Sequence, residues 1–355
     1  MKHYGDITKL SGYELPVVDV ITGGSPCQDL SIAGPREGLH GERSGLFVEQ
    51  IRIVKEMREH SGRTDEYIRP RYMVWENVPG AFSSNGGKDF QAVLTEIVRI
   101  VEPDAPDVPM PAKRWPKSGC LYDEVGGWSV AWRLHDAEFW GVPQRRKRIA
   151  LVADFGGLSA PEILFERKGL RRHSDKGTEK GKTVAGGFTR DSFKSSETAT
   201  LKIRSGCDGG GKGALIQWDR SATLSTLQDQ TLFTNHLARR LTPLEYERLQ
   251  GFPDGWTDIG DWIDSNGKKH DAADAPRYKA LGNSIATPFW FYLLRRISAQ
   301  YERPATLGSL FDGIGGFPYC WEKCNGKGTA IWASEIEEFP IAVTKARFSD
   351  DEETD

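Results

Sequence analysis

The chain is poor in cysteine, and this scarcity excludes a fold held together by disulfides. Its 355 residues contain five cysteines, an odd number spread along the sequence, whereas disulfide scaffolds are short and dense in cysteine. No second pair of Cys or His stands at zinc spacing from the last two, so we expect buried cysteines and no metal. This usage is typical of a reducing compartment, and we expect a cytoplasmic protein. The five positions are Cys27, Cys120, Cys207, Cys320 and Cys324.

Long apolar runs and an excess of charge of one sign are also missing. No uninterrupted apolar stretch reaches the roughly 20 residues that a membrane-spanning helix needs, so we predict no membrane association. The 47 basic and 50 acidic residues give a net charge of -3, which lacks the general positive charge of many nucleic-acid binders. Any nucleic-acid site must therefore be a local basic patch.

The sequence does contain short β-branched runs that alternate with amphipathic helical stretches. This alternation covers both ends of the chain and is interrupted, from about 156 to 240, by a stretch rich in glycine, serine, threonine and charge. We predict an α/β fold with a mostly parallel sheet built from both ends of the chain. The predicted strands are 17–22, 71–78, 128–134, 148–155, 306–313 and 328–335. The predicted helices are 44–59, 89–101, 284–297 and 337–348, together with one inside 239–256 that Thr242 caps and Gly251 ends.

A glycine-rich turn with the sequence FDGIGGF occupies residues 311–317. It follows a predicted strand, and Glu335 lies at the end of the next predicted strand. Glycines let a ligand approach the backbone, and a carboxylate in this position accepts hydrogen bonds from a ribose. The layout indicates a nucleotide or nucleoside pocket; the alternative is a tight turn beside a surface glutamate.

Two more candidate positions stand at the ends of predicted strands. Cys27 follows the first strand in GGSPCQDLS, and Glu76 ends the second in WENVPG. Both fall at the carboxyl edge of an α/β sheet, where ligands bind, so Cys27 is a candidate nucleophile. A structural cysteine and a helix-capping glutamate are the alternative.

Four adjacent basic residues lead into the predicted strand at 148–155. Such a run is usually a solvated face, but here it reaches the same edge of the sheet, where it could contact an anion or a base. The four are Arg145, Arg146, Lys147 and Arg148.

These segments, with others, resemble the sequence blocks of the DNA cytosine-5 methyltransferases. The resemblance covers nearly the whole chain outside residues 156–238. It implies an enzyme that transfers a methyl group from S-adenosyl-L-methionine to C5 of cytosine in double-stranded DNA, leaving S-adenosyl-L-homocysteine. The blocks are GGSPCQDLS (23–31), WENVPG (75–80), PQRRKRIALVAD (143–154), RRLTPLEYERLQGFP (239–253), ALGNSIATP (280–288) and LFDGIGGF (310–317), the last with Glu335 downstream.

The resemblance also implies catalytic roles. Cys27 would attack C6 of the cytosine, because C5 is otherwise too weak a nucleophile to take the methyl group. Glu76 would bind the exocyclic amine and N3, and Arg148, with Arg146 as a second candidate, would bind the carbonyl oxygen and favour the thiolate. The base must leave the duplex to reach Cys27, and the loop Ser31–Gly45 is the expected lid.

The cofactor site implied by the resemblance lies on the glycine-rich turn. Glu335 would hold the ribose, Asp6 and Ile7 would lie near the adenine, and Asn283 and Ser284 would close the methionine end. The other assigned residues are Phe311, Asp312, Gly313, Ile314, Gly316 and Ile336, the last standing where many relatives carry tryptophan, so that weaker stacking on the adenine is expected.

The inserted region would be the target-recognition domain, for which we predict residues 156–275. The catalytic domain would then consist of 1–155 and 276–355, the second part ending in an acidic tail. Thr223 and Leu224 resemble the Thr-Leu pair of the family. The residues expected to bind DNA are Ser31, Gln144, Arg145, Gly210, Lys212, Thr223 and Leu224.

The order of the blocks departs from the family. Most relatives begin with the FDGIGGF block, whereas here it follows GNSIATP. We therefore predict a Rossmann-like methyltransferase sheet that is circularly permuted, with the two ends of the ordered chain on one surface near 337–348 and HYGDIT.

Three functions are compatible with these features. The first is sequence-specific DNA methylation, with base flipping, by a monomer in a bacterial or phage-infected cell, with or without a cognate restriction endonuclease. The second is a catalytically silent DNA-binding protein of the same fold. The third is a tRNA cytosine-5 methyltransferase.

Overall fold

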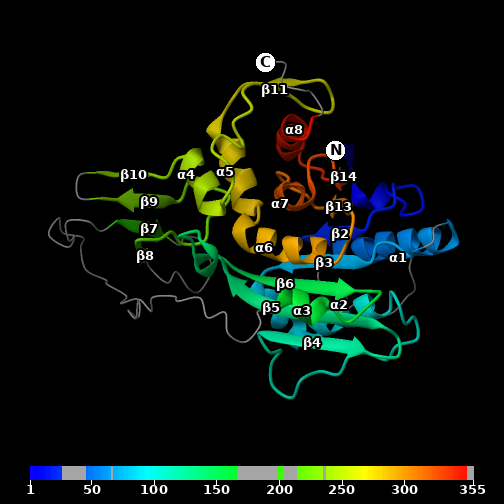
Figure 1. Ribbon diagram of the computed structural model, residues 1–355. Helices are drawn as coiled ribbons and strands as arrows, with labels where there is room; N and C mark the ends of the chain where they lie inside the picture. Colours follow the sequence, from blue (N-terminus) through cyan, green and yellow to red (C-terminus); the bar gives the residue numbers. More distant parts are fainter. Residues whose placement is uncertain (26–44, 65–66, 166–197, 204–213, 235–236, 350–355) are drawn as a thin grey trace.

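An eight-stranded sheet forms the centre of the molecule in the computed structural model, which describes residues 1–25, 45–64, 67–165, 198–203, 214–234 and 237–349 (Figure 1). The strand order is β1-β14-β13-β2-β3-β6-β5-β4. The strands are β1 (Lys2–Tyr4), β2 (Val20–Gly23), β3 (Tyr72–Asn77), β4 (Ser118–Asp123), β5 (Trp128–Asp136), β6 (Lys147–Asp154), β13 (Leu307–Leu310) and β14 (Ala330–Ser334).

The C-terminal strands lie in the middle of this sheet. β13 pairs with β2 on one side and with β14 on the other, and β14 pairs with β1. The prediction that both ends of the chain build one sheet is therefore confirmed. Whether this order is a circular permutation stays a prediction.

The prediction of a mostly parallel sheet holds for five of the eight strands, and the sheet as a whole is mixed. The strands from β1 to β3 run parallel, whereas β6, β5 and β4 pair antiparallel. Only a short turn separates β4 from β5, and parallel neighbours need a crossover of a dozen or more residues. The predicted strands at 128–134 and 148–155 have the right positions, but hydrophobic runs do not reveal direction.

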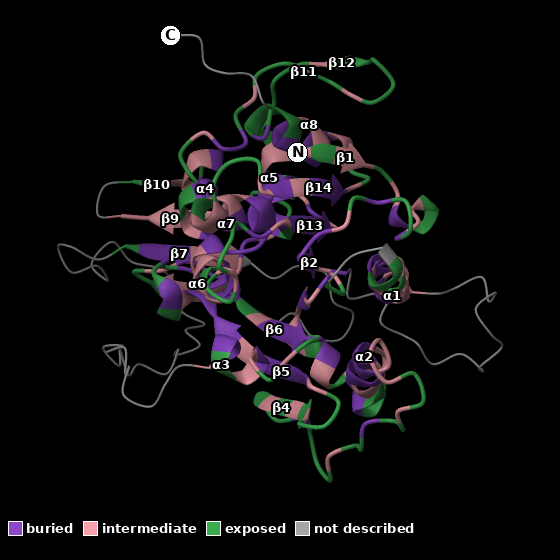
Figure 2. Cartoon of the chain, turned by 45° about the vertical axis from the view of Figure 1, so that its right-hand side comes forward, coloured by how far each residue is buried: buried purple, intermediate pink, exposed green. Residues whose placement is uncertain are grey.

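Helices cover both faces of the sheet (Figure 2). On one face α1 (Leu46–Thr64) and α2 (Lys88–Val98) pack over side chains such as Trp75 and Trp332. On the other face α3 (Ala160–Leu164), α6 (Thr287–Ser298) and α7 (Gly316–Asn325) pack around Trp290 and Trp321. Short 3-10 turns occupy η1 (Ile7–Lys9), η3 (Pro79–Phe82), η4 (Ser84–Gly87) and η5 (Ala137–Trp140).

A third apolar cluster joins α4 (Pro243–Gln250), α5 (Asp274–Asn283) and α8 (Glu338–Arg347). α4 starts and stops as predicted: Thr242 and Glu245 form a capping box, and Gly251 ends the helix with a positive φ of 78°. This cluster connects the main sheet to the smaller one.

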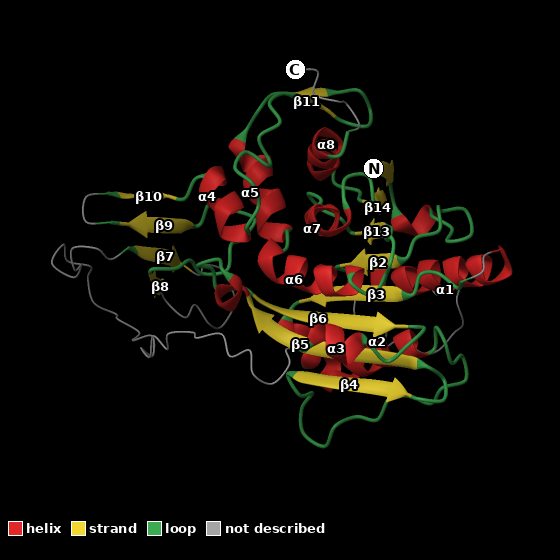
Figure 3. Ribbon diagram, in the orientation of Figure 1, coloured by secondary structure: helices red, strands yellow, loops and turns green. Residues whose placement is uncertain are grey.

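The smaller sheet has four strands in the order β10-β9-β7-β8 and stands to one side of the helices (Figure 3). Its strands are β7 (Ala199–Ile203), β8 (Ala214–Trp218), β9 (Gln230–Phe233) and β10 (Ala238–Arg240). A separate hairpin of β11 (Trp262–Ile263) and β12 (Lys269–His270) packs against α8 through the rings of Trp262 and Phe339.

The N-terminus lies against the last helix of the chain (Figure 1). The Met1 ammonium donates a 3.0 Å hydrogen bond to the carbonyl of Phe348, the residue that caps α8. His3 Nε2 lies 2.7 Å from Thr344 Oγ1, and burial is the main cause that lowers the pKa of His3 to about 4. The prediction that the two ends share one surface is confirmed.

In the described residues, no helix combines the length and apolarity that would let it span a membrane.

Candidate active site

The turn after β13 is held in an unusual backbone conformation. Phe311 has a φ of 53°, a left-handed value that costs energy in any residue but glycine, and Gly313 follows at 58°. A Cβ on Gly313 would meet nothing within 4 Å. The turn therefore leaves open space in front of its own backbone at the carboxyl edge of the sheet.

Glu335 closes this turn from the next strand. One carboxylate oxygen accepts the Gly313 amide at 2.7 Å, and the other accepts the amides of Ile336 and Glu337 at 2.7 and 2.9 Å. These amides fix the carboxylate at the end of β14, while the side chain stays partly exposed. A fixed and accessible carboxylate is suited to accept hydrogen bonds from the hydroxyl groups of a ligand.

Asp312 is buried beneath the same turn. Its Oδ1 accepts a 2.5 Å hydrogen bond from Ser309 Oγ, whereas its Oδ2 has no partner among the described residues. Burial raises the pKa of Asp312 to about 8. The hydrogen bond from Ser309 acts in the opposite direction, and the negative charge of Glu335 adds to the increase. At neutral pH this carboxyl group is therefore mostly protonated.

The other residues predicted at the cofactor divide into two groups. Ile336 and Asn283 are exposed, and Asp6 is partly exposed while its carboxylate accepts a hydrogen bond from the Thr8 amide. The residues whose side chains or Cα positions are buried are Ile7, Ile314, Ser284 and Gly316. Ile314 packs in the third apolar cluster, so only its backbone can face a ligand on the turn.

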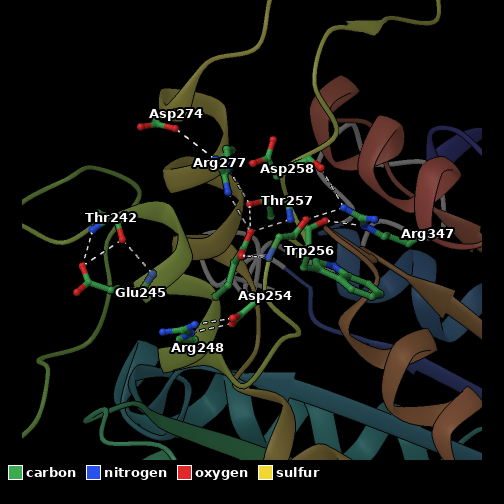
Figure 4. A network of polar contacts seen from close by, with 12 residues as sticks. Thr242, Glu245, Arg248, Asp254, Trp256, Thr257, Asp258, Asp274, Arg277 and Arg347 are labelled. Atoms are coloured by element: carbon green, nitrogen blue, oxygen red, sulfur yellow. Dashed lines mark hydrogen bonds and ion pairs between the residues drawn. The ribbon is translucent and has the colours of Figure 1, made fainter.

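Trp256 anchors the glycine-rich turn to α4. Its indole donates a 2.8 Å hydrogen bond to the Ile314 carbonyl. Figure 4 shows the loop that carries Trp256 and Thr257. This loop is ordered by Glu247, which is fully buried and accepts from the amides of Gly255 and Thr257. Arg277 also donates to Glu247 at 3.3 Å. None of these supporting contacts was predicted, because they depend on residues far apart in the sequence.

Glu76 and Arg148 form an ion pair at the same edge of the sheet. Arg148 Nε lies 2.7 Å from Glu76 Oε1, and the two side chains are only 15% and 13% exposed. A Cβ added to Gly24 would lie 3.1 Å from Glu76 Oε2, so this carboxylate touches the end of β2. β2 and β3 are neighbours, which brings together the two strand ends chosen from the sequence.

The chain just before Cys27 is fixed by the residues that flank Glu76. Trp75 donates from its indole to Ser25 Oγ at 3.0 Å, and Asn77 donates from its amide to the Ser25 carbonyl at 3.0 Å. Ser25 is therefore held two residues before Cys27 and beside the Glu76–Arg148 pair.

Arg146 is buried, with 2% of its surface exposed. Its Nη2 donates to the carbonyls of Gly282 at 3.2 Å and Ser284, and its Nε and Nη1 have no partner among the described residues. Burial, with a contribution from Arg148, lowers the pKa of Arg146 well below its usual value. Its contacts are those of a residue that positions the chain.

The residues predicted to contact DNA differ in exposure. Gln144 is fully buried and donates to the Leu249 carbonyl at 2.8 Å, and Leu224 is 2% exposed. Arg145 is held by Asp136 and Glu138 at 3.0 and 3.1 Å. Gln144 and Leu224 are therefore buried in this conformation, and their contact with DNA stays a prediction. The two carboxylates around Arg145 were not found from the sequence.

Thr223 also makes an internal contact, because its hydroxyl donates to the Arg145 carbonyl. The predictions for Cys27, Ser31, Gly210 and Lys212, and for the lid 31–45 except Gly45, lie outside the described residues. Groups of three or more His, Cys, Asp or Glu that could hold a metal ion do not occur within the described part of the chain.

A sequence profile of the C-5 cytosine-specific DNA methylases matches residues 1–100 and 122–299. The chain belongs to this family.

Several curated relatives are similar to this chain over most of its length. A DNA N-6-adenine-methyltransferase of Escherichia phage P1 is 27% identical over 83% of the chain. The type II methyltransferases M2.BsuMI of Bacillus subtilis and M1.ScrFI of Lactococcus lactis are 27% and 26% identical over 77% and 80% of it. The chain spans 55%, 58% and 63% of the length of these three relatives.

Among solved structures, this chain is similar to the Dnmt2 methyltransferase of S. pombe, with 16% identity, 83% of each chain covered and a TM-score of 0.42. A putative DNA modification methyltransferase from an E. coli prophage has 16% identity and a TM-score of 0.41, with 83% of this chain and 84% of that chain covered.

S-adenosylmethionine, which the family implies, fits the residues of the turn. Gly313 has open space for a ligand, the Glu335 carboxylate is fixed beside it and partly exposed, and the buried Oδ2 of Asp312 lacks a partner among the described residues. Exposed Ile336 stands directly after Glu335, where an adenine next to the ribose would lie. The bound cofactor would supply an electrophilic methyl group.

Proposed function

We propose that this chain is a sequence-specific DNA methyltransferase that methylates C5 of a flipped-out cytosine. The observation that carries the proposal is the Glu76–Arg148 ion pair at 2.7 Å, which lies beside the strand end before Cys27 and at the same sheet edge as Glu335. One region would thus be lined by the nucleophile Cys27, by the pair Glu76 and Arg148 that binds the base, and by the cofactor carboxylate of Glu335.

Each residue would act on a separate part of the cytosine. The Cys27 thiolate would add to C6, which makes C5 electron-rich enough to take the methyl group. Glu76 would hold the exocyclic amine and N3, and Arg148 would bind the carbonyl oxygen while keeping Glu76 in place. Loss of the C5 proton to a base and release of Cys27 would restore the ring.

The DNA would enter between the catalytic sheet and the small sheet β7–β10. Reaching Cys27 requires the base to leave the duplex, at a cost of a few kcal/mol. We assign target recognition to the region 156–275 and catalysis to 1–155 and 276–355, in a monomer that acts with or without a restriction endonuclease.

The test is the modified base in the DNA of a host that lacks its own cytosine methylation and expresses this chain. We expect 5-methylcytosine at one short sequence, read by bisulfite sequencing, and none with Cys27→Ser. Methylation of adenine N6, for which the phage P1 relative is named, methylation of tRNA alone, or unmodified nucleic acid would contradict the proposal.

A further inference from the structure

Three polar side chains are buried in a row beneath the glycine-rich turn. The Thr22 hydroxyl of β2 lies 3.4 Å from the Ser309 hydroxyl of β13, which in turn donates at 2.5 Å to Oδ1 of Asp312. Thr22 and Ser309 are fully buried, and Asp312 is 6% exposed. The row therefore ends in a carboxyl group that solvent hardly reaches, at the base of the turn that we assign to the cofactor.

The Asp312 carboxyl group has no cationic partner within the described part of the chain. Its Oδ2 makes no hydrogen bond there, and the charge that acts on it is the negative one of Glu335 at the end of β14. The backbone around it adds only uncharged groups, since the Asp312 amide donates to Ser334 and its carbonyl accepts from the Gly315 amide. A buried carboxylate without a cation is costly, so the cofactor-free chain holds the neutral form.

S-adenosylmethionine carries two positive charges close to its ribose. Its sulfonium is bonded to the ribose C5′ carbon, and its ammonium stands three carbons further along the methionine part. Gly313 follows Asp312 directly, has open space in front of it and donates its amide to Glu335 at 2.7 Å, so a ribose on Glu335 brings these charges near Asp312. At an effective dielectric constant of about 20, a positive charge about 5 Å away favours the ionised carboxylate by more than about a hundredfold.

We propose that Asp312 releases its proton to solvent when the cofactor binds and becomes the counter-ion of a cationic group in the methionine part. The inference rests on the proposed function, because it takes S-adenosylmethionine as the methyl donor of this chain. Protons then compete with the cofactor for the same carboxylate, so the affinity for S-adenosylmethionine rises with pH. The buried acid thereby makes cofactor binding depend on the charge of the ligand.

The test counts the protons that are released when S-adenosylmethionine binds to the unmodified chain without DNA. Calorimetry at pH 7 in buffers of different ionisation enthalpy gives this number, because the buffer takes up each released proton. Since the pKa of Asp312 is about 8 in the cofactor-free chain, we expect about 0.8 proton per cofactor bound. The affinity should rise at least about tenfold from pH 6 to pH 7.5, a range that ends below the ordinary pKa of the ligand's own amine.

Three ligands identify the cationic group that Asp312 stabilises. S-adenosylmethionine carries both the sulfonium and the ammonium, S-adenosylhomocysteine carries the ammonium alone, and adenosine carries neither. Proton release with the first two ligands assigns Asp312 to the ammonium, and release with S-adenosylmethionine alone assigns it to the sulfonium; either result supports the proposal. Equal release with adenosine, or no release with S-adenosylmethionine, would overturn it.

Asp312→Asn assigns the released proton to this residue, because the amide keeps the shape of the carboxyl group and does not titrate. We expect this variant to bind S-adenosylmethionine without proton release and with an affinity that changes less than about twofold from pH 6 to pH 7.5. Glu337→Gln is the matched control, since that side chain is 51% exposed and pairs with Lys279, and it should release as many protons as the unmodified chain.

Full proton release from a folded Asp312→Asn would overturn the assignment. If this variant does not fold, the three ligands on the unmodified chain still decide between release and no release. A chain that binds no S-adenosylmethionine at all would contradict the proposed function instead.

Discussion

Glu335 and Asp312 show how much of the cofactor site can be recognised from the sequence. Glu335 was chosen because it lies at the end of the predicted strand that follows the glycine-rich segment. In the structure it does fix that segment, since it accepts the Gly313 amide. Asp312 was chosen only as a member of the same block. Its burial and its unpartnered Oδ2 follow from packing around it, which no local pattern reports.

Replacing Glu335 by alanine should weaken the binding of S-adenosylmethionine. Hydrogen bonds to a charged acceptor are worth about 1.5 to 3 kcal/mol, so the dissociation constant should rise roughly ten- to a hundredfold. Glu337→Ala is the matched control, because that carboxylate is 51% exposed and pairs with Lys279 on the surface. Equal affinities for the two variants in calorimetry would move the ribose site elsewhere.

Asp312 should make stability depend on pH. Its pKa of about 8 in the folded chain lies above the ordinary value, so between these values the folded chain keeps a proton that the unfolded chain loses. The free energy of unfolding should therefore fall as pH rises from about 4 to about 8, by roughly 1.4 kcal/mol per unit from this group. Asp312→Asn removes that contribution.

Urea unfolding of both proteins without cofactor measures this effect. The stability of Asp312→Asn relative to the unmodified chain should increase between about pH 5 and pH 8 and stay constant above. A difference that does not change with pH would mean that Asp312 is ionised throughout.

At the scale of elements, α4 shows which parts of the fold are locally encoded. Its start at Thr242 and its end at Gly251 were predicted, because capping depends on neighbouring residues. The antiparallel pairing of β6, β5 and β4 was not, since hydrophobic runs do not reveal strand direction. The contacts of Gln144 were also missed, because they join it to α4, which lies far along the chain. In the sequence Gln144 looks like an exposed polar residue, but in the structure it is buried against α4.

Two ion pairs on and near α4 should differ sharply in their effect on stability (Figure 4). Glu247 is fully buried and accepts from the amides of Gly255 and Thr257 as well as from Arg277, so Glu247→Ala leaves buried donors without an acceptor and should cost about 3 to 5 kcal/mol. Asp254, 56% exposed, pairs with Arg248, 60% exposed, so Asp254→Ala should cost less than about 1 kcal/mol. Urea unfolding compares them, and similar losses would refute the supporting role of Glu247.

At the scale of the whole molecule, the order of the sequence blocks predicts that the C-terminal block can be moved to the front of the chain. The pairing of the strands supports this prediction. β13 and β14 lie between strands from the N-terminal part, and Met1 is hydrogen bonded to Phe348. Moving 305–348 in front of Met1 through a short flexible link, and ending the chain near Arg303, should keep the packed contacts. Stability should change modestly, because loop-closure entropy grows slowly with length.

The rearranged chain should fold, bind S-adenosylmethionine and methylate the same site as the original order. Circular dichroism, calorimetry and sequencing of modified DNA test the three properties. Several link lengths are needed, since one short link can strain the join. If every length gives an unfolded or inactive protein, the C-terminal block does not complete this sheet within one chain.

The central claim is that Cys27 forms a bond to C6 of the target base, and trapping on 5-fluorocytosine tests it most directly. Fluorine at C5 replaces the proton that must leave after methyl transfer, so the bond between sulfur and C6 cannot be released. Mixing the chain with a duplex that carries 5-fluorocytosine at the methylated site should give a complex that survives denaturing electrophoresis. It should appear only with S-adenosylmethionine present and not with Cys27→Ser. A chain that methylates ordinary DNA but forms no such complex, or an equal yield from Cys27→Ser, would contradict the account.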